Sequence, residues 1–186
     1  VDLKSFDEAY LLYDKAVSVM ESTENGMLEV AITYLNIASA KEAELGAEDS
    51  EGVIEELLNK AAETAKRTNA ILFINALDKS EKGWRNTTFA FDRNGNPAGK
   101  YFKAHPVASE IIKRGLDDSY SSAFCAPTIL EIEDMRFAFL TCYDFYFYEI
   151  FAAMARKNVD IIIGCSHQRT DTHATLEMIN RFCSYH

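Results

Sequence analysis

The spacing of apolar residues divides this chain into two regions that meet near residue 65. In the first region, apolar positions recur every three or four residues among Ala, Leu and Glu, as they do in amphipathic helices. Ser5 and Glu8 form a capping-box pattern at the start of this region. The spacing predicts three helices, over about 6–21, 27–45 and 50–67.

In the second region, short apolar runs alternate with helical patterns. Tight turns are expected at Asp92–Pro97 and at Glu133-Asp134, each between two such runs. The predicted strands are 70–74, 84–91, 98–102, 128–132, 136–140 and 159–164, and the predicted helices are 148–157 and one that begins at Thr172. Strands interleaved with helices are typical of a layered α/β fold, so we expect a helical segment, 1–62, followed by an α/β domain, 63–186.

The helical segment also contains a repeated spacing. Residues 9–16 and 54–61 place three apolar residues at the same intervals, with a period of 45 residues. This spacing resembles the second-helix signature of tetratricopeptide-type repeats, whose usual period is about 34 residues. A plain antiparallel helix bundle explains the pattern equally well, and both interpretations stay open.

The charge of the chain is concentrated at one end. The net charge is −10, and residues 1–60 hold 14 Asp and Glu against four Lys, whereas residues 61–186 are balanced. A nucleic-acid surface requires a basic stripe, which this sequence lacks, so we exclude a nucleic-acid partner. The acidic helices are expected to form a solvated face.

The sequence also indicates the compartment. No apolar run approaches the roughly 20 residues that span a bilayer, and the N-terminus lacks the basic-then-apolar pattern of a signal peptide. The four cysteines, at 125, 142, 165 and 183, have no C-x-x-C spacing, which argues against a disulfide scaffold or a zinc site. We therefore expect a soluble, cytoplasmic protein without a metal.

Two short motifs carry the candidate chemistry. The motif Cys142–Asp144 follows the apolar run 136–140, and the motif Lys100–Pro106 has Lys103 at its centre. An apolar strand that ends near a cysteine delivers the thiol to the carboxyl end of a sheet, where open α/β folds place their active sites. Lysine and cysteine meet there only if the fold brings the two motifs together.

The two motifs resemble those of the carbon-nitrogen hydrolase (nitrilase/amidase) superfamily, and the resemblance extends over about 51–185. The nucleophile motif of that family is Cys-Tyr-Asp-x-Arg-Phe-Pro-Glu, and Tyr146 and Tyr148 replace its Arg and Pro here. Its lysine motif is Tyr-Arg-Lys-x-His, in which Phe102 replaces the Arg. The resemblance implies a nitrilase-like α-β sandwich, present in part.

The resemblance also implies roles for individual residues. Cys142 would be the nucleophile, Lys103 the catalytic lysine and Glu110 a second acid of the site, with Tyr143 and His105 as substrate contacts. A thiolate attacks the carbon, a carboxylate moves the proton, and an ammonium with a backbone N–H stabilises the oxyanion. The expected activity is cofactor-independent hydrolysis of a non-peptide carbon-nitrogen bond, in a small amide, N-carbamoyl compound or nitrile, through a cysteine thioester.

The general-base glutamate of the family has no counterpart in this sequence. In the family it closes an early strand in a Pro-Glu pair, whereas 29–36 has neither residue after its apolar run. Glu81 and Glu110 are candidate substitutes. Because the chain stops at His186, before the closing strands of the family, we expect a fragment, a chimera or a decayed relative. The alternative function is a catalytically inactive interaction protein, in which acidic helical repeats are attached to a hydrolase-like remnant.

An aromatic run surrounds the cysteine motif. Tyr143, Phe145, Tyr146, Phe147 and Tyr148 either line a pocket, form a subunit interface or belong to the core. Members of the family commonly pair through nearby helices, so the resemblance implies a homo-oligomer. Asp144 and Glu149 are expected to fix the loop and the following helix start by hydrogen bonds.

Overall fold

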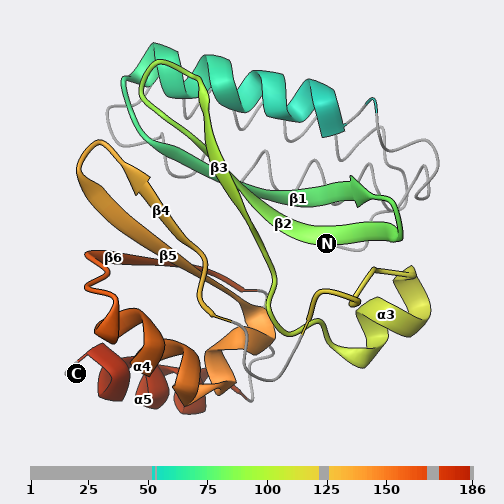
Figure 1. Cartoon of the computed structure of the whole chain (residues 1–186), viewed down its shortest axis with the longest axis vertical. Coiled ribbons are helices and arrows are strands. Elements are labelled where there is room, and N and C mark those ends of the chain that lie inside the picture. Colours follow the sequence, from blue (N-terminus) through green and yellow to red (C-terminus); the bar gives the residue numbers. More distant parts are fainter. Residues whose placement is uncertain (1–51, 53, 122–125, 167–171, 185–186) are drawn as a thin grey trace. The chain divides into compact units, whose positions relative to one another are not determined.

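The computed structural model describes residues 52, 54–121, 126–166 and 172–184 (Figure 1). The chain divides into two compact units, one of residues 1–77 with 89–97 and the other of residues 78–88 with 98–186. The helices expected over 6–21 and 27–45 lie outside the described residues. The tetratricopeptide-like interpretation and the domain division at residue 62 therefore stay predictions.

The first unit contains a helix over residues 54–68, close to the third helix that the sequence predicts. Its Ala61 and Ala65 pack against Ile74 and Phe91 in a buried cluster. Leu57, which the pattern places on the inner face, is 5% exposed. Small residues on this face let the helix lie close to the strands. The apolar positions of the helical pattern are therefore the ones that pack.

A turn of the first unit explains a glycine. Asp92 Oδ1 accepts hydrogen bonds from the backbone N–H groups of Asn94 and Asn96, at 2.9 and 2.8 Å. Gly95 in this turn has φ +80°, and a Cβ there would lie 2.5 Å from the carbonyl oxygen of Ala62. Both the left-handed backbone and the close approach require glycine, which confirms the turn expected at Asp92–Pro97.

Three strands form the first sheet, in the order β1-β2-β3. They are β1 (Leu72–Ser80), β2 (Gly83–Phe91) and β3 (Pro97–Phe102). The predicted strand at 70–74 is displaced, because β1 begins two residues later and continues through polar residues to Ser80. Pairing with β2 extends the strand past its apolar run, which hydrophobic spacing alone does not show.

The second sheet lies in the second unit, in the order β4-β5-β6. It consists of β4 (Ile129–Ile132), β5 (Met135–Thr141) and β6 (Ile161–Cys165). Glu133 and Asp134 have φ of +51° and +66°, which gives the expected two-residue turn between the antiparallel β4 and β5. β5 is central and pairs in parallel with β6, which brings Thr141 opposite Cys165.

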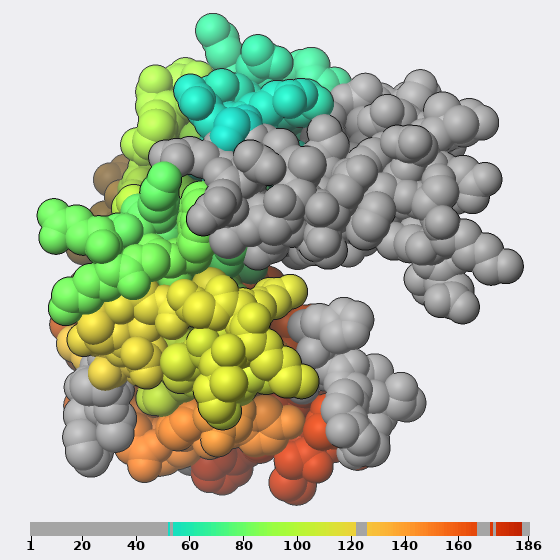
Figure 2. All heavy atoms as spheres, turned by 90° about the vertical axis from the view of Figure 1, so that its right-hand side faces the viewer, coloured from blue at the N-terminus to red at the C-terminus, as the bar shows by residue number. Residues whose placement is uncertain are grey.

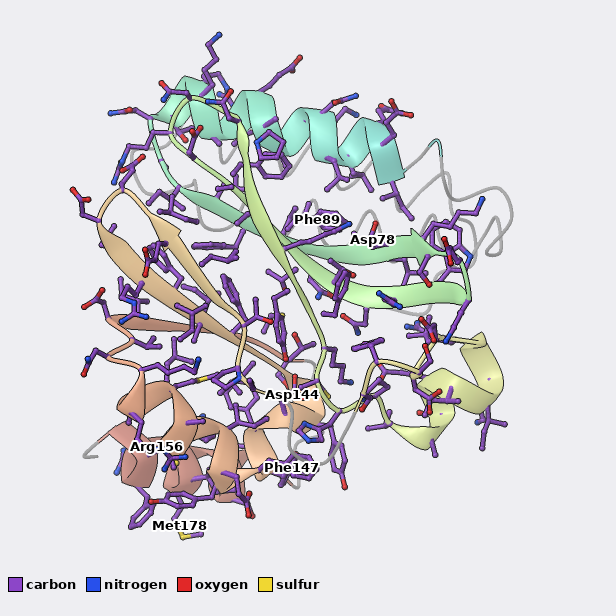
Figure 3. The ribbon with its side chains drawn as sticks, in the orientation of Figure 1. Asp78, Phe89, Asp144, Phe147, Arg156 and Met178 are labelled. Atoms are coloured by element: carbon purple, nitrogen blue, oxygen red, sulfur yellow. The ribbon has the colours of Figure 1, made fainter. Side chains whose placement is uncertain are left out.

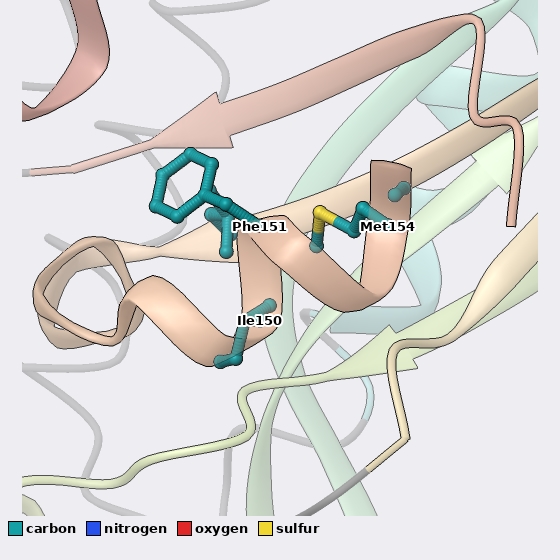
Figure 4. Close-up of a cluster of buried hydrophobic side chains, with 5 residues drawn as sticks. Ile150, Phe151 and Met154 are labelled. Carbon is teal, nitrogen blue, oxygen red and sulfur yellow. The ribbon is translucent and has the colours of Figure 1, made fainter. Parts of the chain in front are cut away.

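Two helices cover one side of this sheet, α4 (Tyr148–Arg156) and α5 (His173–Ser184) (Figure 1). Ile150, Phe151 and Met154 of α4 pack on Ala138 and Leu140 of β5 (Figure 4). The apolar side chains at positions i, i+1 and i+4 of α4 thus cover one face of the strand that leads to Cys142. The interleaved strands and helices confirm the predicted layered α/β fold.

The apolar side chains of α5 differ in burial. Leu176 is 7% exposed, and Ile179 and Cys183 pack against the core cluster. Phe182 is 54% exposed and contacts the ring of Tyr148 at a centroid distance of 6.1 Å. The last turn of α5 therefore covers the cluster with Cys183 and exposes Phe182.

Two further elements were not predicted. They are α3 (Ala108–Arg114) and the short 3-10 helix η1 (Cys142–Tyr146). Figure 2 shows α3, in yellow, at the surface, and its Ile112 is 81% exposed. Both elements are too short for a hydrophobic period to develop. Among the described residues, no helix is long and apolar enough to cross a membrane.

Candidate functional site

The thiol of Cys142 lies where β5 ends. Thr141 is the last residue of the strand, and Cys142 opens η1 with φ +52°. A non-glycine residue in this left-handed conformation costs of order 1–2 kcal/mol, so the surrounding contacts hold it there. The thiol residue is half-buried, and the strand thus carries a cysteine to its C-terminal end in a strained turn.

Lys103 lies just after β3, and its side chain is buried. The side chain is 1% exposed, and Nζ donates a hydrogen bond of 2.6 Å to Oε2 of Glu110. A buried ammonium is costly without a counter-charge, so Glu110 is the charge partner that allows Lys103 to be buried. Lys103 and Glu110, which the sequence analysis placed in one site, are therefore in contact.

Glu110 has further donors around it. Its Oε2 accepts the backbone N–H of Val107 at 2.8 Å, and its Oε1 accepts the amide of Asn86 at 3.0 Å. Burial alone raises the pKa of this carboxyl, but the hydrogen bonds from Lys103, Val107 and Asn86 outweigh burial and lower the pKa below its usual range. Glu110 is therefore ionised at neutral pH.

A single carboxylate joins the cysteine turn to the lysine segment. Asp144, at the centre of η1 and labelled in Figure 3, has a fully buried side chain. Its Oδ1 accepts the backbone N–H of His105 at 2.8 Å and lies 3.0 Å from Nδ1 of the same residue. Its Oδ2 accepts the hydroxyl of Tyr101 at 2.5 Å and the backbone N–H of Thr141 at 2.9 Å.

These bonds confirm that Asp144 fixes the loop. They also affect Tyr101, because burial and the negative charge of Asp144 raise the pKa of its hydroxyl far above the usual value. The tyrosine is thus a permanent donor. The carboxylate ties together chain segments that lie 39 and 43 residues apart, and it brings the two sequence motifs into one network.

His105 and Tyr143 both contact Phe147, the residue between η1 and α4. The imidazole of His105 stacks on the Phe147 ring with a centroid distance of 3.7 Å, and Tyr143 packs edge-on against the same ring at 5.2 Å. His105 is 8% exposed, whereas Tyr143 is 42% exposed. Of these two predicted substrate contacts, Tyr143 presents its side chain to solvent and His105 is buried.

The aromatic run does not act as one cluster. Phe145 and Phe147 pack against the core of the second unit. Tyr143, Tyr146 and Tyr148 are exposed by 42%, 39% and 52%. The core interpretation thus holds for the two phenylalanines, and the pocket and interface interpretations stay open for the tyrosines.

Further contacts that the sequence analysis missed hold the main chain of the lysine segment. Tyr120 donates its hydroxyl to the carbonyl of Lys103 at 2.8 Å, and Ser121 donates to the carbonyl of Ala104 at 2.7 Å. The backbone N–H of Lys103 donates to the carbonyl of Asn86 at 2.9 Å. No spacing in the sequence predicts the contacts of Tyr120 and Ser121, because these residues lie in an irregular segment 17 residues further along the chain.

The two candidate substitutes for the general base lie in different surroundings. Glu81 is exposed in the turn between β1 and β2, whereas Glu110 contacts Lys103. The thiol of Cys165 lies 3.6 Å from Thr141 Oγ1, and burial raises the pKa of that thiol. Among the described residues, no group of three or more His, Cys, Asp and Glu side chains is placed to hold a metal ion.

Comparison with known proteins identifies the family of the chain. The family model described as carbon-nitrogen hydrolase matches residues 27–182, and it begins earlier in the chain than the resemblance noted above. A search of curated protein sequences found no match.

Solved structures share the fold. A carbon-nitrogen hydrolase from Helicobacter pylori matches at a TM-score of 0.62 and 18% identity, over 97% of this chain and 64% of that one. An amidase mutant from Nesterenkonia sp. AN1, with the acetamide moiety of fluoroacetamide at its active-site cysteine, matches at 0.62 and 16%, over 94% and 64%. Nit3 of Saccharomyces cerevisiae, in the nitrilase superfamily, matches at 0.56 and 22%, over 68% and 45%. The chain therefore spans less than two thirds of these proteins and has part of a nitrilase-type α-β sandwich.

Proposed function

Because this chain belongs to the carbon-nitrogen hydrolase family, we propose that it hydrolyses a non-peptide carbon-nitrogen bond through a thioester at Cys142. The substrate class is a small amide, N-carbamoyl compound or nitrile. The observation that carries the proposal is the hydrogen-bond network of Asp144, which holds the turn at Cys142 and the segment of Lys103 together. The solved amidase with an acetamide moiety on its cysteine supports an amide as the first substrate to test.

The reaction begins with attack of the Cys142 thiolate on the carbonyl carbon of an amide. A carbon-sulfur bond forms, and the carbonyl π pair moves onto oxygen. Lys103 Nζ and the backbone N–H of Tyr143 stabilise this oxyanion. When the tetrahedral adduct collapses, the carbon-nitrogen bond breaks, ammonia leaves with a proton from a carboxylic acid, and a thioester remains. Water then attacks the thioester carbon, the carbon-sulfur bond breaks, and the acyl group leaves as a carboxylic acid while the thiol is regenerated.

Glu110 supplies the carboxylate in this proposal. It holds the Lys103 ammonium at 2.6 Å, and its Oε1 accepts the Asn86 amide while keeping a second lone pair for the thiol proton. A general base works within hydrogen-bond reach or through one water molecule. The lowered pKa of Glu110 keeps it in the proton-accepting form at neutral pH.

Of the two expected substrate contacts, Tyr143 is proposed to touch the substrate and His105 to position Tyr143. The exposed ring of Tyr143 is available to the part of the substrate beyond the reacting carbon. His105 acts through the Phe147 ring on which it stacks. A homo-oligomeric assembly and a cytoplasmic location stay predictions of the sequence.

The direct test is ammonia release from a panel of small amides, N-carbamoyl compounds and nitriles. The chain is compared with Cys142→Ala, and Cys183→Ala serves as a control that also removes one thiol. We expect release from the parent and from Cys183→Ala, and none from Cys142→Ala. Release that persists in Cys142→Ala, or a folded parent that releases nothing, contradicts the proposal, and the second outcome leaves the interaction-protein alternative.

A further inference from the structure

We propose that Asp144 is the positioning residue that sets the placement of Lys103 relative to Cys142. The inference rests on the proposed function, in which these two side chains act on one carbonyl group. It assigns to Asp144 no contact with substrate. Its role is to fix two main-chain segments with one carboxylate.

The bonds of Asp144 fall symmetrically about the lysine. Tyr101 and His105 lie two residues before and two residues after Lys103, and both donate to the Asp144 carboxylate. β3 ends at Phe102 and the chain bends at Ala104 and His105, so the two flanking residues reach the same carboxylate and anchor the main chain on both sides of Lys103.

The same carboxylate fixes the turn that presents the thiol. The backbone N–H of Thr141, directly before Cys142, donates to Oδ2 at 2.9 Å. Cys142 has φ +52°, a conformation that persists only where neighbouring contacts impose it. Asp144 therefore controls both partners at once, and a change at this residue displaces the lysine and the cysteine together.

The chemistry of the site requires a carboxylate. Oδ1 faces two nitrogen atoms of His105, and Oδ2 faces a hydroxyl and a backbone N–H. An asparagine has one acceptor oxygen and one donor NH₂ group. If the NH₂ occupies the place of Oδ2, the N–H of Thr141 loses its acceptor, and if it occupies the place of Oδ1, the N–H of His105 does. Either orientation releases one of the two segments.

The test is a double-mutant cycle on the alkylation rate of Cys142, measured with iodoacetamide and peptide mapping. An adjacent ammonium favours the reactive thiolate, so Lys103→Met should slow alkylation in the parent by about tenfold. In the Asp144→Asn background the lysine is already displaced, and Lys103→Met should change the rate by about twofold or less. Coupled residues give such non-additive effects, whereas independent ones do not.

Asp117→Asn is the matched control. Asp117 is another buried aspartate of the second unit, and its partners are Arg85, Ser80 and Ser119. In that background Lys103→Met should keep its roughly tenfold effect. An equal Lys103→Met factor in the parent and in Asp144→Asn overturns the proposal. An unchanged alkylation rate on Lys103→Met in the parent also overturns it, because Lys103 would then have no effect on Cys142 for Asp144 to control.

Tyr101→Phe keeps the proposal testable if Asp144→Asn does not fold. It removes one of the two donors to Oδ2 and retains the aromatic stack with Phe139, at 5.7 Å. We expect the Lys103→Met factor to fall to about threefold in this background, and an unchanged factor contradicts the assignment. Alkylation does not require turnover, so the two proposals can fail separately. A non-additive cycle without ammonia release contradicts the proposed function and supports the positioning role of Asp144. An additive cycle with ammonia release supports the proposed function and contradicts the positioning role.

Discussion

Two buried aspartates of the second unit show how differently one side chain can be used. Asp117 accepts hydrogen bonds from Arg85 at 2.8 Å, from Ser80 at 3.2 Å and from the backbone N–H of Ser119 at 2.9 Å. Arg85 also forms an ion pair with it at 2.7 Å. Asp144 accepts two backbone N–H groups and the hydroxyl of Tyr101, and it contacts an imidazole.

The difference lies in what each carboxylate holds. Asp117 has a guanidinium partner, which itself packs against the rings of Phe102 and Tyr120 at 5.0 and 4.7 Å. Its side-chain partners Arg85 and Ser80 lie 32 and 37 residues before Asp117, and the charged pair compensates the buried carboxylate. Asp144 instead accepts the backbone N–H of His105, 39 residues away, and that of Thr141, three residues away. Both acids therefore join distant segments, Asp117 through side chains and Asp144 through main-chain donors beside Lys103 and Cys142.

The largest effect is expected at the lysine that the Asp144 network places. Lys103→Met removes the proposed oxyanion donor, and loss of one such donor typically lowers turnover about 10²–10³-fold. The measurement is the rate of ammonia release at saturating substrate. Lys100→Met is the control, because Lys100 is exposed and pairs with Asp78. A loss of the same size in Lys100→Met would show that the effect does not belong to the site.

The second prediction compares the stability of the two aspartate variants. Asp144→Asn leaves a buried backbone N–H without an acceptor, and we expect a loss of about 2–4 kcal/mol in the free energy of unfolding. Asp117→Asn should cost less, because the side chain of Arg85 is 22% exposed and water can replace part of the lost bonding. Urea denaturation of both variants measures the difference. Equal losses would erase the distinction between the two acids.

The third prediction concerns pH. Hydrogen bonds from Ser119, followed by those from Arg85 and Ser80, lower the pKa of Asp117. Hydrogen bonds from Lys103, Val107 and Asn86 lower the pKa of Glu110. A carboxyl whose pKa is lower in the folded state than in the unfolded state stabilises the fold above its ordinary pKa of about 4, and this contribution is lost as the pH falls through the lower, folded value. Stability should thus decline below about pH 4, and less steeply in Asp117→Asn. A parallel decline in parent and variant contradicts this.

The smallest effect is expected at Tyr120, which contacts both the partner of Asp117 and the Lys103 segment. Tyr120 packs its ring on Arg85 and donates its hydroxyl to the carbonyl of Lys103. Tyr120→Phe keeps the ring and removes one hydrogen bond, so the expected loss in unfolding free energy is about 1 kcal/mol. Ammonia release should fall only slightly, and a loss as large as that of Lys103→Met would assign Tyr120 to the reaction itself.

The sequence predicted the second sheet well because its signals are local. The strand ending before Cys142 and the turn at Glu133-Asp134 follow from an apolar run and from a two-residue connection. The sequence also placed Lys103, Glu110 and Cys142 in one site, and the structure brings Lys103 into contact with Glu110. Their catalytic roles stay predictions.

What the sequence could not give depends on contacts between distant residues. The bond from Tyr120 to Lys103 and the donors around Asp144 arise only after the chain has folded. The extension of β1 to Ser80 depends on pairing with a neighbour, and the exposure of Phe182 depends on which side of the last turn of α5 packs on the buried cluster. Hydrophobic spacing indicates which face of a helix or strand is buried, and it does not indicate at which residue the element ends.

The proposed thioester at Cys142 can be trapped with hydroxylamine. Hydroxylamine attacks a thioester and releases a hydroxamate together with the free thiol, so the chain is mixed with a small amide and hydroxylamine and the hydroxamate is measured. We expect hydroxamate formation by the parent and by Cys183→Ala, and none by Cys142→Ala. Equal hydroxamate formation by Cys142→Ala would contradict the proposed thioester, because acyl transfer would then proceed without the thiol at the end of β5.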